Sequence, residues 1–160
     1  MWKRANSDGG ALTTVQLLQK AETYCSKAEH CRLEVRDKLF AWGADNEKAE
    51  EIIDRLIDEG FISEERYCRA YLHDKVLFQG WGKEKVRMML SAKRLPSALI
   101  NEALLTFPEQ DYMAVLQRVA QQKQRTLSGE EDERVRDGKL TQYLLTRGFT
   151  YSEIKSSGVP

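Results

Sequence analysis

Apolar residues recur at helical spacing along almost the whole chain. The clearest stripe follows Asp45, where apolar residues stand at positions i, i+3, i+4, i+7 and i+8. Its members are Ala49, Ile52, Ile53, Leu56 and Ile57. This spacing places one face of an α-helix against a core, because a helix has about 3.6 residues per turn. No segment alternates apolar and polar residues as a strand does, so the pattern predicts an all-α protein.

Start and stop signals divide the pattern into successive helices. Thr13 and Gln16 form a capping-box pattern at the start of the first helix. The predicted helices cover residues 14–27, residues 31–42, the segment after Asp45, residues 63–78, residues 83–93, a segment beginning near Pro96, one ending near Arg125, one ended by Gly148 and a short one around Ile154. The predicted core face holds Tyr67, Ala70, Tyr71 and Phe78 in the fourth helix, and Val86, Met89 and Leu90 in the fifth.

A three-fold internal repeat underlies these helices. Residues 35–53 align without gaps to residues 86–104 at an offset of 51 residues, and a third copy follows at an offset of 54. The aligned positions are Val35, Leu39, Gly43, Ala49 and Ile53; Val86, Leu90, Arg94, Ile100 and Leu104; and Leu140, Leu144, Gly148 and Ile154. A three-helix unit is too small to bury its own apolar faces, so we expect neighbours to stack into an elongated, curved helical body. This predicts a flexible N-terminal tail (residues 1–10) and three helical repeats (residues 11–59, 60–107 and 108–160).

A tight corner joins the first repeat to the second. Gly60 ends one apolar-periodic segment and Ser63 opens the next, because a hydroxyl cap followed by acidic residues suits the positive end of a helix. Phe61 and Ile62 lie inside the corner and are predicted to plug it. The pattern alone therefore indicates a packed elbow.

The same elbow resembles the signature of the RecX family, bacterial regulators of the RecA recombinase. Family members carry a turn of glycine, an aromatic and an aliphatic residue, followed by acids, arginine, an aromatic and a small residue. The matching residues here are Gly60, Phe61, Ile62, Glu64, Glu65, Arg66, Tyr67 and Ala70. A second glycine-containing turn and a basic helix are matched by Gly80, Gly82, Lys83, Val86, Leu90 and Lys93. The resemblance covers nearly the whole chain and is sharpest from about Glu51 to Leu95.

The resemblance implies three-helix repeats and a regulatory function. Members of the family bind the RecA nucleoprotein filament and modulate, most often inhibit, the recombinase and ATPase activities of RecA in DNA recombination, repair and the SOS response. This chain differs from basic members in having no net charge and an acidic first repeat.

Composition bounds the class and location of the protein. The 160 residues are 41% hydrophobic and 31% charged, which suits a soluble globular protein. We expect a cytoplasmic monomer without a membrane partner, because no apolar run approaches the roughly 20 residues of a membrane span and the start lacks a signal-peptide pattern. Cys25, Cys31 and Cys68 cannot all pair within one chain, so we expect free thiols.

Charge is unevenly distributed along the chain. Residues 1–65 hold 9 basic and 14 acidic side chains, residues 66–125 hold 11 and 5, and the remainder holds 5 and 6. A positive middle suits phosphates, and an acidic flank suits a basic protein surface. The alternative for any one basic residue is a solvated helix face.

Basic and aromatic residues mix within this positive middle. Such mixtures hold single strands, because cations meet phosphates while bases stack on rings. The candidates to face DNA, single-stranded or double-stranded, or the filament are Lys75, Trp81, Lys83, Lys85, Arg87, Lys93, Arg94, Arg118, Lys123 and Arg125. We expect Phe78 to be buried in the core, leave the exposure of Trp81 open, and expect Arg118, Lys123 and Arg125 to project into solvent.

Catalytic chemistry finds little support. His30 and His73 are the two histidines, and neither belongs to a zinc-protease motif; no phosphate loop or nucleophile elbow occurs. Cys25, His30 and Cys31 lack the spacing of paired zinc ligands. We therefore expect a protein without catalytic residues, metal or cofactor.

Two alternatives to a RecA regulator remain open from the sequence. The first is a direct DNA-binding protein that uses the helix after Gly82 for recognition. The second is a helical adaptor for another protein.

Overall fold

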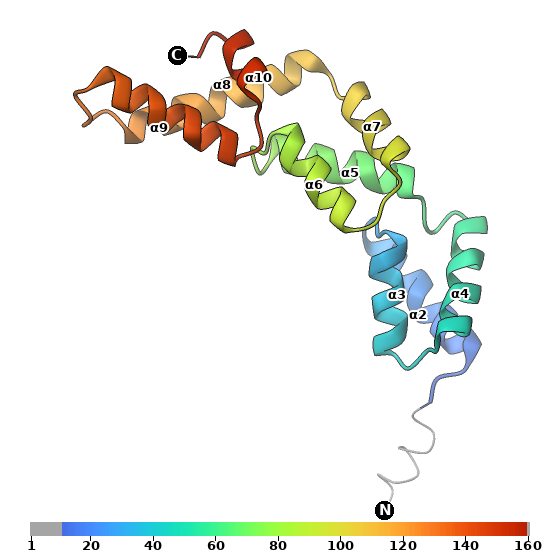
Figure 1. The fold of residues 1–160 in the computed structure, drawn as a ribbon. Helices are drawn as coiled ribbons and strands as arrows, with labels where there is room; N and C mark the ends of the chain where they lie inside the picture. The colour runs from blue at the N-terminus through green and yellow to red at the C-terminus, as the bar shows by residue number, and fades with distance from the viewer. Residues whose placement is uncertain (1–10, 160) are drawn as a thin grey trace, which may run out of the picture. The chain divides into compact units, whose positions relative to one another are not determined.

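The computed structural model describes residues 11–159, and within this range the chain forms nine α-helices and no strands (Figure 1). In order they are α2 (Thr14–Lys27), α3 (Arg32–Ala41), α4 (Asn46–Asp58), α5 (Glu64–Leu77), α6 (Lys83–Ala92), α7 (Ser97–Thr106), α8 (Glu109–Thr126), α9 (Glu133–Thr146) and α10 (Tyr151–Ser156). The predicted all-α class is confirmed. The predicted tail, residues 1–10, lies outside the described residues.

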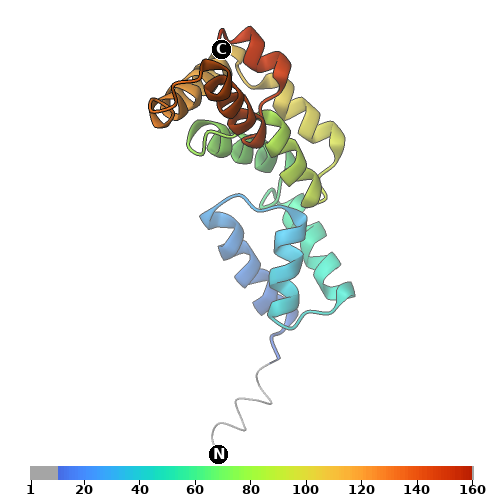
Figure 2. The same cartoon turned by 60° about the vertical axis from the view of Figure 1, so that its left-hand side comes forward.

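The chain divides into two compact units. Unit 1 runs to Tyr67 and contains α2, α3, α4 and the first turn of α5; unit 2 begins at Cys68. In unit 1 the three complete helices lie side by side (Figure 2). The predicted stripe on α4 is confirmed, since Ala49, Ile52, Ile53 and Leu56 are buried there.

The predicted hydroxyl caps at Thr13 and Ser63 are both present, and Asp45 adds a third cap; the Ser63 hydroxyl accepts a hydrogen bond from the Arg66 N–H at 3.3 Å. The Thr13 hydroxyl accepts a hydrogen bond from the Gln16 N–H at 3.2 Å, and the Gln16 side chain accepts one from the Thr13 N–H at 2.9 Å. Asp45 accepts a bond from the Lys48 N–H at 2.8 Å. These contacts satisfy backbone donors that a helix start leaves unpaired.

Unit 2 pairs α6 with α7, α8 with α9, and α9 with α10. Its core combines residues from all three pairings, with Tyr112, Val86 and Leu90 fully buried. Among the described residues, no helix has both the length and the apolarity of a membrane span. The three cysteines are buried and unbridged, as expected.

The internal repeat is visible at the second helix of each copy. Val35, Val86 and Leu140 are all buried, and so are Leu39, Leu90 and Leu144 one turn later. Each of these helices ends with the same hydrogen-bonded cap, in which the N–H of Ala44, Leu95 or Phe149 returns to a carbonyl five residues earlier, at 2.9, 3.3 and 3.1 Å. The aligned turn position is left-handed in all three, with φ of 99° at Gly43, 63° at Arg94 and 104° at Gly148.

Arg94 occupies a backbone conformation that suits glycine. It is the single non-glycine residue with positive φ among residues 11–159, and this conformation costs a residue with a Cβ about 1 kcal/mol. We expect Arg94→Gly to be more stable than Arg94→Ala by about 1 kcal/mol, since both remove the charge and glycine alone removes the strain. Thermal melts of the two variants measure this difference, and equal melting temperatures would contradict it.

The predicted core face of α5 is correct at Tyr67, which is buried, but wrong at Ala70 and Phe78, while Tyr71 is partly buried. Phe78 is 74% exposed and Ala70 is also exposed. The buried residues are Tyr67, Cys68, Leu72 and Val76. Phe78 stands one residue beyond the end of α5, so helical spacing no longer governs its direction. In α6, Val86 and Leu90 are buried as predicted, but Met89 is 38% exposed.

Candidate functional site

The elbow at residues 60–67 is held by hydrogen bonds within unit 1. Gly60 has a φ of 80°, and the Phe61 N–H after it bonds to the Leu56 carbonyl at 2.8 Å. The Arg66 guanidinium donates to the Gly60 carbonyl at 2.8 Å and to Glu29 at 2.9 Å. Arg66, the arginine of the family signature, therefore stabilises the turn that precedes α5.

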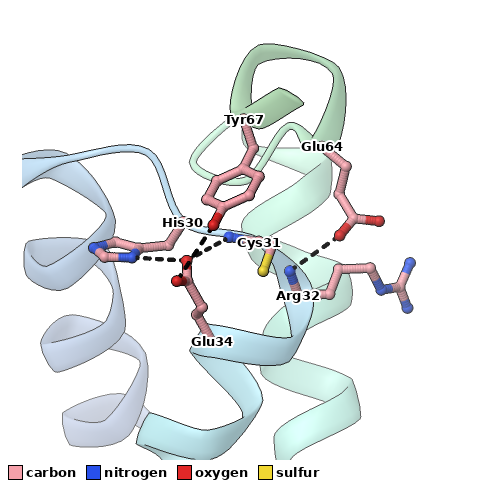
Figure 3. A network of polar contacts seen from close by, with 6 residues as sticks. All are labelled: His30, Cys31, Arg32, Glu34, Glu64 and Tyr67. Carbon is pink, nitrogen blue, oxygen red and sulfur yellow. Dashed lines mark hydrogen bonds and ion pairs between the residues drawn. The ribbon is translucent and has the colours of Figure 1, made fainter. Parts of the chain in front are cut away.

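A second group of contacts joins the start of α5 to the start of α3 (Figure 3). The Tyr67 hydroxyl donates to Glu34 Oε2 at 3.4 Å, and Glu34 Oε1 accepts from the Cys31 N–H at 3.2 Å. Glu64 Oε2 accepts a hydrogen bond from the Arg32 N–H at 3.2 Å. The two acceptors, Glu34 and Glu64, are thus acids in the first turns of α3 and α5, where a carboxylate is favoured. The elbow residues thus have structural roles that explain their spacing.

The elbow plug differs between its two apolar residues. Ile62 is 2% exposed, whereas Phe61 is partly buried against the unit 1 core. We expect Ile62→Ala to lower the free energy of unfolding by about 2 to 4 kcal/mol, and Phe61→Ala to lower it by less. Urea unfolding of the two variants tests this order. A larger loss of unfolding free energy for Phe61→Ala would show that the Phe61 ring, and not Ile62, fills the turn.

A cluster of cations and rings, which we call the Trp81 cluster, surrounds the loop between α5 and α6. Lys75 Nζ lies 5.1 Å and Lys85 Nζ 4.3 Å from the centroid of the partly buried Trp81 ring. The Tyr71 ring lies edge-on to Trp81 at 6.4 Å, and Lys75 Nζ is 5.3 Å from its centroid. Each of the three lysine contacts is a cation–π interaction that positions an ammonium group beside an aromatic ring.

Lys83 is directed elsewhere. Its Nζ lies 4.6 Å from the centroid of the buried Tyr112 ring and 3.8 Å from Glu109, and its side chain is 17% exposed. The Lys83 N–H also donates to the Tyr112 hydroxyl at 2.9 Å. That hydroxyl donates to Glu153 Oε1 at 3.0 Å, so Tyr112 links the starts of α6 and α10. Burial raises the pKa of Tyr112, and the nearby Glu153 carboxylate raises it further.

The remaining candidates on α6 separate along the helix. Arg87 contacts Asn101 on α7 and lies 3.6 Å from Glu84. Lys93 and Arg94 stand at the far end of α6, which at about 1.5 Å per residue is roughly 15 Å from its start. They are therefore not brought into the Trp81 cluster.

Two of the α8 candidates, Arg118 and Lys123, contact residues of α5 and α9. Arg118 donates to the Leu77 carbonyl at 3.0 Å, and Lys123 Nζ lies 4.7 Å from the Tyr143 ring centroid. Arg118 and Arg125 are exposed, and Lys123 is partly buried. Arg118 lines a groove of about 360 Å³, whose other lining residues are Leu77, Phe78, Gln79, Gly80, Val119, Gln122, Tyr143 and Arg147.

The start of α6 rests directly on the end of α9. The Gly82 N–H donates to the Arg147 carbonyl at 2.8 Å, and the Glu84 N–H donates to the Gly148 carbonyl at 3.1 Å. A Cβ at Gly82 would collide with the Gly148 backbone, and one at Gly148 would lie 2.5 Å from the Lys85 Cβ. This close approach of two glycines sets the position of the Trp81 loop.

Three family models match consecutive segments of the chain. They describe the first RecX three-helix domain (residues 18–56), the second (residues 63–104) and the third (residues 109–156). The chain belongs to the RecX family. The predicted repeat architecture and the predicted family are both confirmed.

Individual RecX proteins agree with this assignment. Regulatory protein RecX of Pseudomonas entomophila is 32% identical over 144 residues, which is 89% of either chain. The Clostridium tetani protein of the same name is 27% identical over 134 residues, and the match spans 61% of its length. The crystal structure of RecX from Lactobacillus salivarius has a TM-score of 0.80 at 25% identity and covers 90% of this chain. The chain is thus a member of a family of regulatory proteins.

The contact geometry separates the predicted site residues into those that lie together and those that do not. Lys75, Trp81 and Lys85 come together, whereas Lys83 turns to the interior of unit 2. Sequence reasoning missed Tyr71, Tyr143 and Arg147 as partners of the basic groups; Arg147 contacts the Gln79 carbonyl and lies 5.9 Å from the Tyr143 ring. An arginine directly before the third repeat's turn glycine was the available signal. Among the described residues, no group of His, Cys, Asp or Glu is arranged to hold a metal ion.

Proposed function

We propose that this RecX protein binds the RecA nucleoprotein filament and inhibits the recombinase and ATPase activities of RecA during DNA recombination and repair. Membership of a family of regulatory proteins supports the class of function. The observation that carries the DNA-facing part is the Trp81 cluster, where two ammonium groups flank one tryptophan ring. Cations beside a partly buried ring suit single-stranded DNA, because the phosphates pair with cations and the bases stack on aromatic rings.

The two charge regions of the chain take different partners in this proposal. The Trp81 cluster of unit 2 contacts DNA within the filament. Exposed acids of α4, such as Glu47 and Glu51, contact the recombinase. Glu50 is less suited, because it pairs with Arg36 and Arg32. Bridging of successive RecA subunits then obstructs the entry of duplex DNA or the addition of subunits.

We further propose that the protein acts as a cytoplasmic monomer without metal, cofactor or catalytic activity of its own. Its effect on ATP hydrolysis is then exerted wholly through RecA. A purified preparation that hydrolyses ATP or cuts DNA without RecA would disprove this part.

Direct DNA recognition by α6 is less well supported. Lys83 packs over Tyr112 and Arg87 contacts Asn101. Two of the three basic residues at the start of α6 are therefore engaged with neighbouring helices of unit 2. A recognition helix needs its first turns free to enter a groove. The adaptor alternative has no observation that favours it over a RecA regulator.

The test is RecA-dependent ATP hydrolysis on single-stranded DNA with increasing amounts of this protein, combined with a pull-down of RecA with and without DNA. Inhibition with co-precipitation on DNA supports the proposal. Binding to DNA that is equally strong without RecA, and that falls linearly in log affinity with log salt, would favour a plain DNA-binding protein.

A further inference from the structure

Unit 1 contains a groove in the repeat that the charge count marks as acidic. The groove has a volume of about 520 Å³ and runs along α2 to the end of α3. Its lining consists of Leu12, Gln16, Gln19, Lys20, Thr23, Tyr24, Lys27 and Trp42. This volume lies in the range of clefts that hold small ligands or single nucleotides.

The charge of the groove is opposite to that of its surroundings. Residues 11–65, the part of this segment that the structure describes, hold 13 acidic side chains, and none of these lines the groove, whereas Lys20 and Lys27 both do. These two lysines stand two turns apart on α2, which separates them by about 10 Å along the axis. Lys38 adds a third cation at its edge, with Nζ 5.4 Å from the Tyr24 ring centroid. An anionic ligand is therefore favoured here over a basic one.

The aromatic residues of the groove narrow the ligand class. Lys20 Nζ lies 4.8 Å from the Trp42 ring centroid, the same pairing of ammonium and indole found at Trp81. Tyr24 stands edge-on to Trp42 at 6.3 Å and is already stacked on His30 at 3.8 Å. Trp42 is thus the ring on which a ligand can stack, while the flexible Lys20 side chain moves from the indole to a phosphate.

We propose that this groove binds single-stranded nucleic acid, with one base on Trp42 and phosphates on Lys20 and Lys27. Gln16, Gln19 and Thr23 supply the amide and hydroxyl groups that commonly contact sugars and phosphates. An acidic peptide would need the cations but not the indole. The inference stands on unit 1 alone and does not depend on the Trp81 cluster or on RecA.

The test uses the full chain and a fluorescein-labelled 20-nucleotide oligo(dT), with binding measured by anisotropy across a salt series. In the double variant Lys20→Gln/Lys27→Gln, we expect roughly tenfold weaker binding at low salt and a salt slope lower by about 1.4, because a single strand contributes about 0.7 per phosphate contact. Repeating the pair in a Lys75→Gln/Lys85→Gln background isolates the groove from unit 2, and the same loss is expected there.

The matched control is Lys48→Gln/Arg55→Gln, which removes the same charge from α4, outside the groove lining. It should leave the salt slope unchanged. An unchanged slope in the groove variant, or equal losses in variant and control, would overturn the proposal. So would displacement of oligo(dT) from the groove by a polyglutamate peptide at similar concentration, since that outcome assigns the groove to an acidic protein segment.

Discussion

Reversing Lys75 and Lys85 to glutamate should weaken binding to the DNA-loaded RecA filament by about tenfold or more at moderate salt. Both ammonium groups lie beside the Trp81 ring, at 5.1 and 4.3 Å, so the double reversal replaces two cations with two anions at one place. The salt slope should fall by about 1.4 if each lysine meets one phosphate of a single strand. Inhibition of RecA-dependent ATP hydrolysis should be lost to the same extent. Filament co-sedimentation and the ATPase assay measure the two effects.

The control for this prediction lies in the same unit. Arg134→Glu/Lys155→Glu makes an equal change of net charge at two exposed basic residues that have no contact with the Trp81 ring. It should bind and inhibit almost as the wild type does. If the Lys75/Lys85 variant stays folded and still inhibits at wild-type concentration, DNA contact through the Trp81 cluster is wrong, and inhibition acts through protein contacts alone.

Lys83 does not belong in that test, although it stands between the same residues in the sequence. Its side chain is largely buried over Tyr112, and its reversal would place a carboxylate near Glu109. Such a change would destabilise unit 2 and lose function for a structural reason. A variant that includes Lys83 therefore could not separate DNA contact from folding.

Replacing Gly82 by alanine should lower the free energy of unfolding by about 3 kcal/mol or more. The added Cβ would meet the carbonyl carbon of Gly148, which is backbone and cannot rotate away as a side chain can. The helix start must then move off α9, and the bond from the Gly82 N–H to the Arg147 carbonyl is lost. Urea unfolding monitored by circular dichroism measures the change. Because the same junction positions the Trp81 loop, filament binding should fall as well.

Two other glycines separate the possible causes of that loss. Gly43 has a φ of 99° but no atom within 4 Å of an added Cβ, so Gly43→Ala should cost only the backbone strain of about 1 to 2 kcal/mol. Gly138 lies inside α9 with open space around it, so Gly138→Ala should stabilise by up to about 1 kcal/mol. A Gly82→Ala protein as stable as the wild type would show that the junction can open at little cost.

Local pattern was sufficient for the helices and for the repeat. The stripe on α4, the caps at Thr13 and Asp45, and the turns at Gly43 and Gly148 all depend on residues within a few positions of one another. Such features follow from helical periodicity and from the unpaired groups at helix ends. The same reasoning failed at α5, where Ala70 and, just past the helix, Phe78 are exposed and the stripe of Cys68, Leu72 and Val76 is buried instead. Two apolar stripes run along that helix, and only packing selects between them.

The sequence by itself determined an all-α chain of three similar repeats, the elbow that marks the RecX family, and the uneven distribution of charge. Only the tertiary structure decided which basic residues act together. Lys83 and Lys85 are two positions apart in the sequence, yet one meets Tyr112 and the other Trp81. Lys20 lies over Trp42 and lines one groove with Lys27, in a repeat that the charge count marks as acidic. The physical reason is that periodicity specifies the face of a helix, whereas a side chain's partner comes from another helix whose place depends on long-range packing.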